Sequence, residues 1–265
     1  STYQIQIVRS LWNKWFIQLF YSLAVLIFIA GAVFIFIRRK HNKKMEQLNR
    51  KKLENELQIR TLHSKVLPHF TKNVLTAIAS FAMDDNRKAG KYISLFARFS
   101  ELTLANSDKN YNTLEEEMKY IRTYLELEEM RFRNKLQYEI TIENDVDMQT
   151  FVPAMALHTY CDNAIRHGLV NKKGPGKLNL TIKRNGGETI ISVRDNGIGR
   201  KRSAELGTHG NQLGLKLIQQ QVDFYNSQNE WKIKQEINDL HDEQGKATGT
   251  LIELYIPDGY RFGSN

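Results

Sequence analysis

The sequence has almost no cysteine, and it lacks the two most common nucleotide-binding fingerprints. Its 265 residues include a single cysteine, Cys161, which excludes an internal disulfide and provides no zinc-type ligand spacing. Neither a Gly-x-x-x-x-Gly-Lys-Ser/Thr loop nor a Gly-x-Gly-x-x-Gly motif occurs. Any nucleotide site in this chain must therefore be built on a fold other than the P-loop or Rossmann type.

Excess positive charge is confined to one short segment. The formal net charge is +9, but residues 38–60 alone carry nine Lys and Arg against three Glu. Residues 61–265 carry 27 basic and 26 acidic residues, so most of the chain is nearly neutral. A DNA-binding domain would spread its basic residues over a folded surface. The distribution therefore argues against direct contact with nucleic acid.

A long uncharged stretch precedes the basic segment. Residues 15–37 are 23 residues without a charge, and about 20 apolar residues span a bilayer as a helix. The basic residues that follow predict that the C-terminal side is cytoplasmic. We expect a single-pass anchor in the inner (cytoplasmic) membrane, with residues 1–14 outside. A buried core helix and a signal peptide are the alternatives, but no small-residue cleavage site follows. Because the chain begins with Ser1, we expect the C-terminal part of a longer receptor.

The middle of the sequence predicts helices. Residues 38–66 are charged and lack Gly and Pro, which is typical of a signalling helix, either paired with its copy or solvated alone. Within 67–132, apolar residues recur every three or four positions on both sides of a break at 84–86. This pattern predicts a helical hairpin, and two hairpins would form a four-helix bundle in a homodimer.

Residues 133–260 predict an α+β domain. Thr113 and Glu116 have capping-box spacing and begin a helix that runs to about residue 132. Beyond it, strands are expected at 136–142, 177–184, 189–194, 231–237 and 250–256, and helices at 153–169 and 212–224. Alternation of this kind predicts one mixed sheet covered by helices, an α/β sandwich.

His69 is the candidate phosphate acceptor. Pro68 precedes it and loosens the helix locally, and Asn73 lies one turn on, on the same helix face. A neutral imidazole is a competent nucleophile near pH 7. A plain surface histidine is the alternative, and His63 is a weaker rival acceptor.

Two further segments could form a nucleotide site. Asn163 lies on an apolar helix, where its amide could either bond a neighbouring strand or ligate Mg²⁺ beside a triphosphate. Asp195, Gly197 and Gly199 follow an apolar strand, where they form either a turn or a loop that approaches a flat ligand. Gly210 and Gly214 flank a polar loop before a helix N-terminus, which suits phosphates.

Together these residues resemble the sensor histidine kinases of the LytS type, with a GHKL (Bergerat) ATP-binding domain. The family's Pro-His-Phe-x-x-Asn acceptor pattern is matched from Pro68 to Asn73. Its Glu-Asn-Ala-x-x-His-Gly motif is matched from Asp162 to Gly168, with Asp for Glu. The resemblance implies that Asn163 holds Mg²⁺, that Asp195 binds adenine with Gly197 and Gly199, and that Arg166 and His167 lie near the phosphates. It further assigns Gly210 and Gly214 to the lid over the nucleotide.

Some positions depart from the family pattern. Thr71 and Lys72 replace an apolar pair, Lys65 stands where Gln is frequent, and Gln212 occupies a lid position that is usually Gly. GHKL hydrolases place a water-activating Glu four residues before the Mg²⁺ ligand, and Thr159 is found there. The chain is therefore expected to transfer phosphate to a side chain and not to water.

The resemblance implies a two-component sensor histidine kinase. With ATP and Mg²⁺, it would phosphorylate His69 and pass the phosphoryl group to an aspartate of a response regulator. Asn73 and Asp162 are the further candidate catalytic residues, and Asp162 is the candidate base. A phosphatase-dominated receptor and a non-catalytic nucleotide-gated scaffold are the alternatives.

Overall fold

The computed structural model describes residues 2–106, 109–133, 135–206 and 212–262. Within these ranges, the side chains at 2–13, 48–49, 51–69 and 212–213 lie outside the description. The chain divides into two compact units, Ser1–Leu53 and Glu54–Asn265. The first helix, α1 (Thr2–Asp84), contributes to both units.

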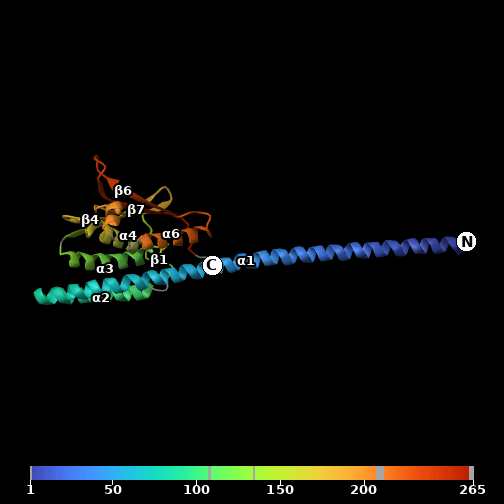
Figure 1. The fold of residues 1–265 in the computed structure, drawn as a ribbon, viewed down its shortest axis with the longest axis horizontal. Coiled ribbons are helices and arrows are strands. Elements are labelled where there is room, and N and C mark those ends of the chain that lie inside the picture. The colour runs from blue at the N-terminus through green and yellow to red at the C-terminus, as the bar shows by residue number, and fades with distance from the viewer. Residues whose placement is uncertain (1, 107–108, 134, 207–211, 263–265) are drawn as a thin grey trace. The chain divides into compact units, whose positions relative to one another are not determined.

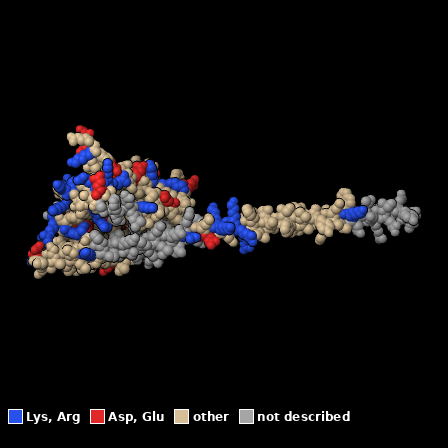
Figure 2. All heavy atoms as spheres, in the orientation of Figure 1, with Lys and Arg blue, Asp and Glu red and all other residues tan. Residues whose placement is uncertain are grey.

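The first unit contains the predicted membrane anchor. Lys14–Gln47 is long and apolar enough to cross a membrane, and its apolar window has no buried residue. Figure 2 shows residues 15–37 in tan alone, and a dense group of Lys and Arg comes directly after them. An apolar helix surface that no protein atom covers is expected to contact lipid or another helix.

The helical hairpin of the second unit turns at the predicted break. α1 ends at Asp84 and α2 (Asn86–Asn106) follows after one residue. The carboxylate of Asp85 accepts the backbone N–H groups of Arg87 at 3.0 Å and Lys88 at 3.3 Å. Asp85 therefore caps α2, which is why the chain turns at this aspartate.

The third helix, α3 (Leu114–Phe132), has the predicted bounds. Thr113 Oγ1 accepts the N–H of Glu116 at 3.2 Å, and Glu116 Oε2 accepts the N–H of Thr113 at 3.0 Å. Each side chain thus accepts a hydrogen bond from the backbone N–H of the other residue, which fixes where the helix begins.

The five-stranded sheet is mixed, as predicted. Its order is β2-β4-β5-β7-β6, formed by β2 (Leu136–Ile142), β4 (Gly176–Asn185), β5 (Glu188–Asp195), β7 (Ala247–Pro257) and β6 (Lys234–His241). β2 and β4 pair in parallel, since a helical crossover joins them, and the other pairs are antiparallel. Gly186 and Gly187 form the hairpin turn between β4 and β5, both with positive φ.

Helices cover one face of the sheet. α4 (Ala156–Asn163), the π-helix η1 (Ala164–Leu169) and α6 (Gln212–Asn226) pack on it, and α3 packs on α4. α2 in turn packs on α3, so the helices form successive layers beneath the sheet (Figure 1). Alternate residues of β4 are buried, which is typical of a sheet with one covered face.

Two sequence expectations about element bounds are wrong. Pro153 was expected to open a helix, but it ends the short strand β3 (Phe151–Pro153), which pairs with β1 (Tyr111–Thr113). Proline favours extended backbone in the residue before it and is tolerated at a strand end, so α4 begins only at Ala156. The strand expected at 231–237 lies at Lys234–His241 instead. The short helix α5 (Arg200–Glu205) was not predicted.

Candidate nucleotide site

The helix that carries Asn163 changes its winding directly after that residue. α4 ends at Asn163 and continues as the π-helix η1, in which the N–H of Val170 donates to the carbonyl of Ile165 at 2.9 Å. The wide turn leaves the carbonyl of Gly168 to accept the N–H of Ile198 at 3.1 Å. Short π-helical turns are found frequently at functional sites. This one joins the Asn163 helix to the loop after β5.

Asp195 sits in a cradle of glycine backbone at the end of β5. Its Oδ1 accepts the N–H of Gly197 at 2.7 Å. A Cβ on Gly168 would lie 2.6 Å from the same oxygen, and a Cβ on Gly197 would lie 2.4 Å from the backbone of Gly168. Only glycine fits at both positions, so the sequence keeps the helix and the loop in direct backbone contact.

Burial changes the acidity of Asp195. The residue is 4% exposed, and burial raises the pKa of its carboxyl from 3.8 to about 6, against the opposing hydrogen bonds from Gly197 and Thr250. The group is therefore mostly ionised at neutral pH. A buried carboxylate with lone pairs to spare is a suitable acceptor for an exocyclic amine.

Asn163 has a fixed amide orientation. Its Nδ2 donates to the carbonyl of Thr159 at 2.7 Å, and the side chain is buried. Because the nitrogen is held on this side, the amide oxygen points away from the helix backbone and is available as a ligand. A Cβ on Gly214 of α6 would lie 3.1 Å from the methyl of Thr159 and 3.8 Å from Asn163 Nδ2. The start of α6 therefore closes over Asn163.

Arg166 and His167 follow on η1. Arg166 Nη1 lies 3.4 Å from Asp162 Oδ2. His167 Nδ1 lies 3.5 Å from the hydroxyl of Ser203, whereas its Nε2 is buried without a hydrogen-bond partner among the described atoms. Burial, and then the charge of Arg166, lower the pKa of His167, so the ring is neutral at physiological pH. A neutral imidazole with an unused buried nitrogen is suited to a polar ligand.

The lid residues are described in part. Gly199 has a φ of 76° and begins α5, and a Cβ there would lie 2.6 Å from that of Ala247. Gly210 lies outside the described residues, as does the side chain of Gln212. Gly214 is on α6 beside Asn163.

The candidate acceptor is also described only in part. The backbone of His69 belongs to α1, but its side chain lies outside the description. Its neighbour Phe70 is buried, with ring centroids 4.8 Å from Phe99 and 5.6 Å from Tyr124. Asn73, the second residue of the acceptor pattern, is half-buried. The roles assigned to His69 and Asn73 stay predictions.

Two buried carboxylates were not recognised as structural groups from sequence. Glu117 Oε1 accepts the amide of Asn112 at 2.8 Å and the N–H of Met155 at 3.0 Å. The acidic group thereby caps the start of α4, where Met155 has a φ of 64°. Glu128 forms an ion pair with Arg131, and burial raises the pKa of Glu128 to about 7. In the Glu-rich sequence of α3, no local pattern distinguishes these two carboxylates from the exposed ones.

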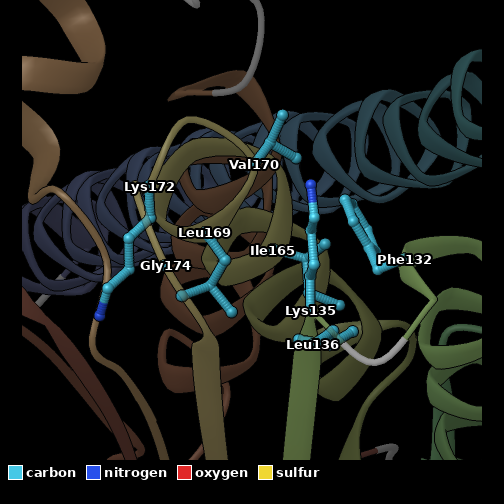
Figure 3. Close-up of a pocket in the computed structure, with 8 residues that line it drawn as sticks. All are labelled: Phe132, Lys135, Leu136, Ile165, Leu169, Val170, Lys172 and Gly174. Atoms are coloured by element: carbon cyan, nitrogen blue, oxygen red, sulfur yellow. The ribbon is translucent and has the colours of Figure 1, made fainter.

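A shallow pocket lies beside η1 (Figure 3), and none of the residues that line it is a predicted nucleotide residue. It encloses about 390 Å³ including solvent, and its walls come from the end of α3, the start of β2 and η1 with the loop that follows. Ile165 and Leu169 line it, whereas Asn163 and Asp195 do not. Lys172 of this pocket donates to the carbonyl of Asn196 at 2.6 Å, which braces the loop after β5.

Sequence comparisons identify histidine kinases as similar proteins. Residues 57–136 match the family model for histidine kinase. The chain is 28% identical to the sensor histidine kinase BtsS of Escherichia coli K12 over 55% of the chain and 26% of that protein. It is 29% identical to the sensor histidine kinase/phosphatase LytS of Staphylococcus aureus Mu50 over 56% of the chain and 25% of that protein. The matched part thus spans about a quarter of each relative's length.

Among solved structures, the histidine kinase domain of the blue-light activated kinase of Erythrobacter litoralis is similar. It has a TM-score of 0.39 and 16% identity over 77% of this chain and 95% of that one. In the family-model match and in the named sequence relatives, the chain is similar to sensor histidine kinases, LytS proteins among them.

Proposed function

We propose that the chain is the membrane-anchored signalling part of a homodimeric histidine kinase that transfers the γ-phosphoryl group of ATP to His69. The observation that carries the proposal is the Asp195 cradle, in which Gly168 and Gly197 leave no room for a side chain. Glycine at both positions lets the loop that carries the buried Asp195 carboxylate contact the helix that carries Asn163. Burial raises the pKa of this acid, and acids with a shifted pKa are frequent at functional sites.

In this proposal each site residue has one role. Asp195 accepts the adenine amine, and Gly197 and Gly199 let the backbone approach the ring. The amide oxygen of Asn163 holds Mg²⁺, which neutralises phosphate charge. Arg166 and His167 contact the phosphates from η1, and the lid with Gly210 and Gly214 covers them.

The proposed reaction forms a bond between a ring nitrogen of His69 and the γ-phosphorus. The bond from that phosphorus to the oxygen of ADP breaks, and the proton on the other ring nitrogen of His69 leaves. Asp162 is the candidate acceptor of this proton, and Asn73 would orient the ring or the phosphoryl group. Thr159 provides no base for water, which favours transfer to protein over hydrolysis. Catalysis would come mainly from positioning and charge neutralisation.

An exposed apolar stripe on the hairpin supports the homodimer. Ile93 and Leu104 are 11 residues apart on α2, about three helical turns, and so share a face. They and two residues of α1 are exposed in the single chain: Leu75 56%, Met83 88%, Ile93 49% and Leu104 74%. A monomer rarely leaves such a stripe uncovered. A second copy would bury it in a four-helix bundle.

Sedimentation of the full chain in detergent micelles tests the dimer. The wild-type chain should sediment as a dimer, and Leu104→Glu should shift it toward the monomer, because a carboxylate would be buried in the interface. A glutamate at the exposed Lys72 serves as the matched control and should leave the dimer intact. Equal sedimentation of both variants would contradict the proposed interface.

Incubation of the full chain with γ-labelled ATP and Mg²⁺ tests the activity. The protein should take up label that is labile in acid and stable in base, as expected for phosphohistidine. Asn163→Ala should abolish uptake because Mg²⁺ loses its protein ligand, and nucleotide binding should weaken in parallel. Unaltered Mg·ATP binding in Asn163→Ala would contradict the site assignment. A wild-type chain that binds ATP and takes up no label would favour the nucleotide-gated scaffold.

A phosphatase activity is the second candidate, because the name of the Staphylococcus aureus relative includes it. Asn73 would then orient water against the phospho-aspartate of the regulator. Receiver-domain proteins loaded chemically with phosphate distinguish the two activities. Faster loss of phosphate with the chain, abolished in Asn73→Ala while autophosphorylation persists, would support the phosphatase.

A further inference from the structure

A buried polar chain links α3 to the start of η1. The hydroxyl of Tyr124 donates to Asp162 Oδ1 at 2.9 Å, and Asp162 Oδ2 lies 3.4 Å from Arg166 Nη1. Tyr124 is 1% exposed and Asp162 9%. Each carboxylate oxygen therefore has a fixed donor, and the position of Arg166 depends on the position of Tyr124.

The other side of Tyr124 packs against the helix that carries His69. Its ring centroid lies 5.6 Å from that of Phe70, the residue directly after His69. Both rings also contact Phe99 of α2, at 4.8 Å from Phe70 and 6.2 Å from Tyr124. Because buried rings are close-packed, a movement of Phe70 changes where the Tyr124 ring can lie.

The charges around Asp162 make the hydrogen bond from Tyr124 consequential. After burial, the negative charge of Asp162 also raises the pKa of Glu128 of α3, whereas Arg131 and Arg166 lower it. Two carboxylates that share a site repel each other. The hydroxyl of Tyr124 holds the carboxylate of Asp162 in place, so that its second oxygen stays aimed at Arg166.

We propose that Tyr124 is a positioning residue for phosphoryl transfer, acting through Asp162 to hold Arg166 against the phosphates of bound ATP. This inference rests on the function proposed above. It adds a route by which the packing of the acceptor helix at Phe70 sets the orientation of an arginine in the nucleotide site. Tyr124 touches no substrate in this scheme and acts through Asp162 on the geometry of Arg166.

Tyr120 provides a matched control one turn earlier on α3. It is also 1% exposed and packs on the same Phe99 and His158, with centroids at 4.9 and 5.3 Å. Its hydroxyl accepts from Thr103 at 3.3 Å and not from the nucleotide side. Tyr124→Phe and Tyr120→Phe therefore remove the same atom from similar buried surroundings, but only the first breaks the link to Asp162.

The experiment compares the two variants as full chains in detergent micelles. Three quantities are measured: the melting midpoint, the dissociation constant of Mg·ATP and the labelling rate at saturating γ-labelled ATP. Tyr124→Phe should slow labelling about tenfold, because a misplaced charged group lowers the rate without abolishing binding. Its ATP dissociation constant should stay within about twofold of wild type. Tyr120→Phe should match wild type in both quantities, and both midpoints should fall by similar amounts.

A double mutant tests whether Tyr124 acts through Asp162. Asp162→Asn removes the ion pair with Arg166, so adding Tyr124→Phe to it should slow labelling by less than about twofold more. Independent, multiplying effects of the two substitutions would overturn the inference. Equal labelling rates for Tyr124→Phe and Tyr120→Phe would overturn it alone, provided that wild type is labelled. A wild-type chain that takes no label contradicts the proposed function and this inference with it.

Discussion

Gly168→Ala is expected to damage the nucleotide site through one added methyl group. The new Cβ would lie 2.6 Å from Asp195 Oδ1, which is roughly 1 Å inside normal contact distance. Asp195 cannot yield easily, because Gly197 N–H holds the same oxygen at 2.7 Å. Gly197 packs closely on the same segment, since a Cβ built on it would lie 2.4 Å from the Gly168 backbone, so it has little room to follow. The substitution must therefore displace Asp195 and break this hydrogen bond.

The size of the effect follows from that bond. Loss of a hydrogen bond to a charged group costs about 1.5–3 kcal/mol, and overpacking in a close-packed region costs about 1–3 kcal/mol. If the displaced Asp195 no longer meets the adenine amine, ATP affinity should fall about ten- to hundredfold. Titration of the full chain with a fluorescent ATP analogue measures this, and thermal unfolding measures the cost in stability.

Gly90→Ala is the matched control for that prediction. Gly90 lies on α2, and a Cβ there would meet nothing within 4 Å. Alanine at an exposed helical position should raise the free energy of unfolding by about 0.5–1 kcal/mol and leave ATP binding unchanged. If Gly168→Ala binds ATP and unfolds like Gly90→Ala, the cradle around Asp195 does not form the binding site.

Two more predictions concern acidity and helix capping. ATP affinity should rise between about pH 5 and 7, with a midpoint near 6, because ionised Asp195 is the better acceptor; titrations across this range should show no such rise for Asp195→Asn. Because the pKa of Asp195 is raised, the folded state holds a proton between about pH 4 and 6 that the unfolded state has already released. The contribution of this group to the free energy of unfolding should therefore fall as the pH rises through that range, relative to Asp195→Asn. A free energy of unfolding that rises with pH relative to Asp195→Asn would contradict this. Thr113→Ala should lower the free energy of unfolding by about 1 kcal/mol, since Glu116 N–H loses its acceptor, whereas Thr113→Ser should melt like wild type.

Local side-chain signals explain which elements could be predicted from the sequence. The break after Asp84 and the start of α3 depend on Asp85, Thr113 and Glu116, which act on backbone groups two or three residues away. The hairpin between β4 and β5 depends on two adjacent glycines with positive φ. Signals of this kind are complete within a short stretch of sequence.

Long-range contacts explain what could not be predicted. The pairing of β1 with β3 joins segments about 40 residues apart, and it assigns Pro153 to a strand end where a helix start was expected. The π-helical winding of η1 accompanies the contact of Gly168 with the loop after β5, and no sequence periodicity reveals either. Tyr124 and Asp162 are 38 residues apart in the sequence. Their hydrogen bond depends on the packing of α3 against α4.

The sequence predicted which residues form the candidate site but not the contacts between them. Asn163, Asp195 and Gly197 were chosen from short motifs, and the structure brings the Asn163 helix and the Asp195 loop into contact. Asp162 was considered only as a base, whereas both of its oxygens have donors in the structure. Its role as a proton acceptor for His69 stays a prediction.

The location of the phosphoryl group tests the central claim most directly. The full chain, His69→Gln and His63→Gln are incubated with γ-labelled ATP and Mg²⁺, and acid-labile label on the protein is counted. Both histidines lie on α1, so the second variant controls for loss of a helical imidazole. We predict that His69→Gln takes up no label while His63→Gln matches wild type. Label that persists in His69→Gln would contradict the assignment of the acceptor.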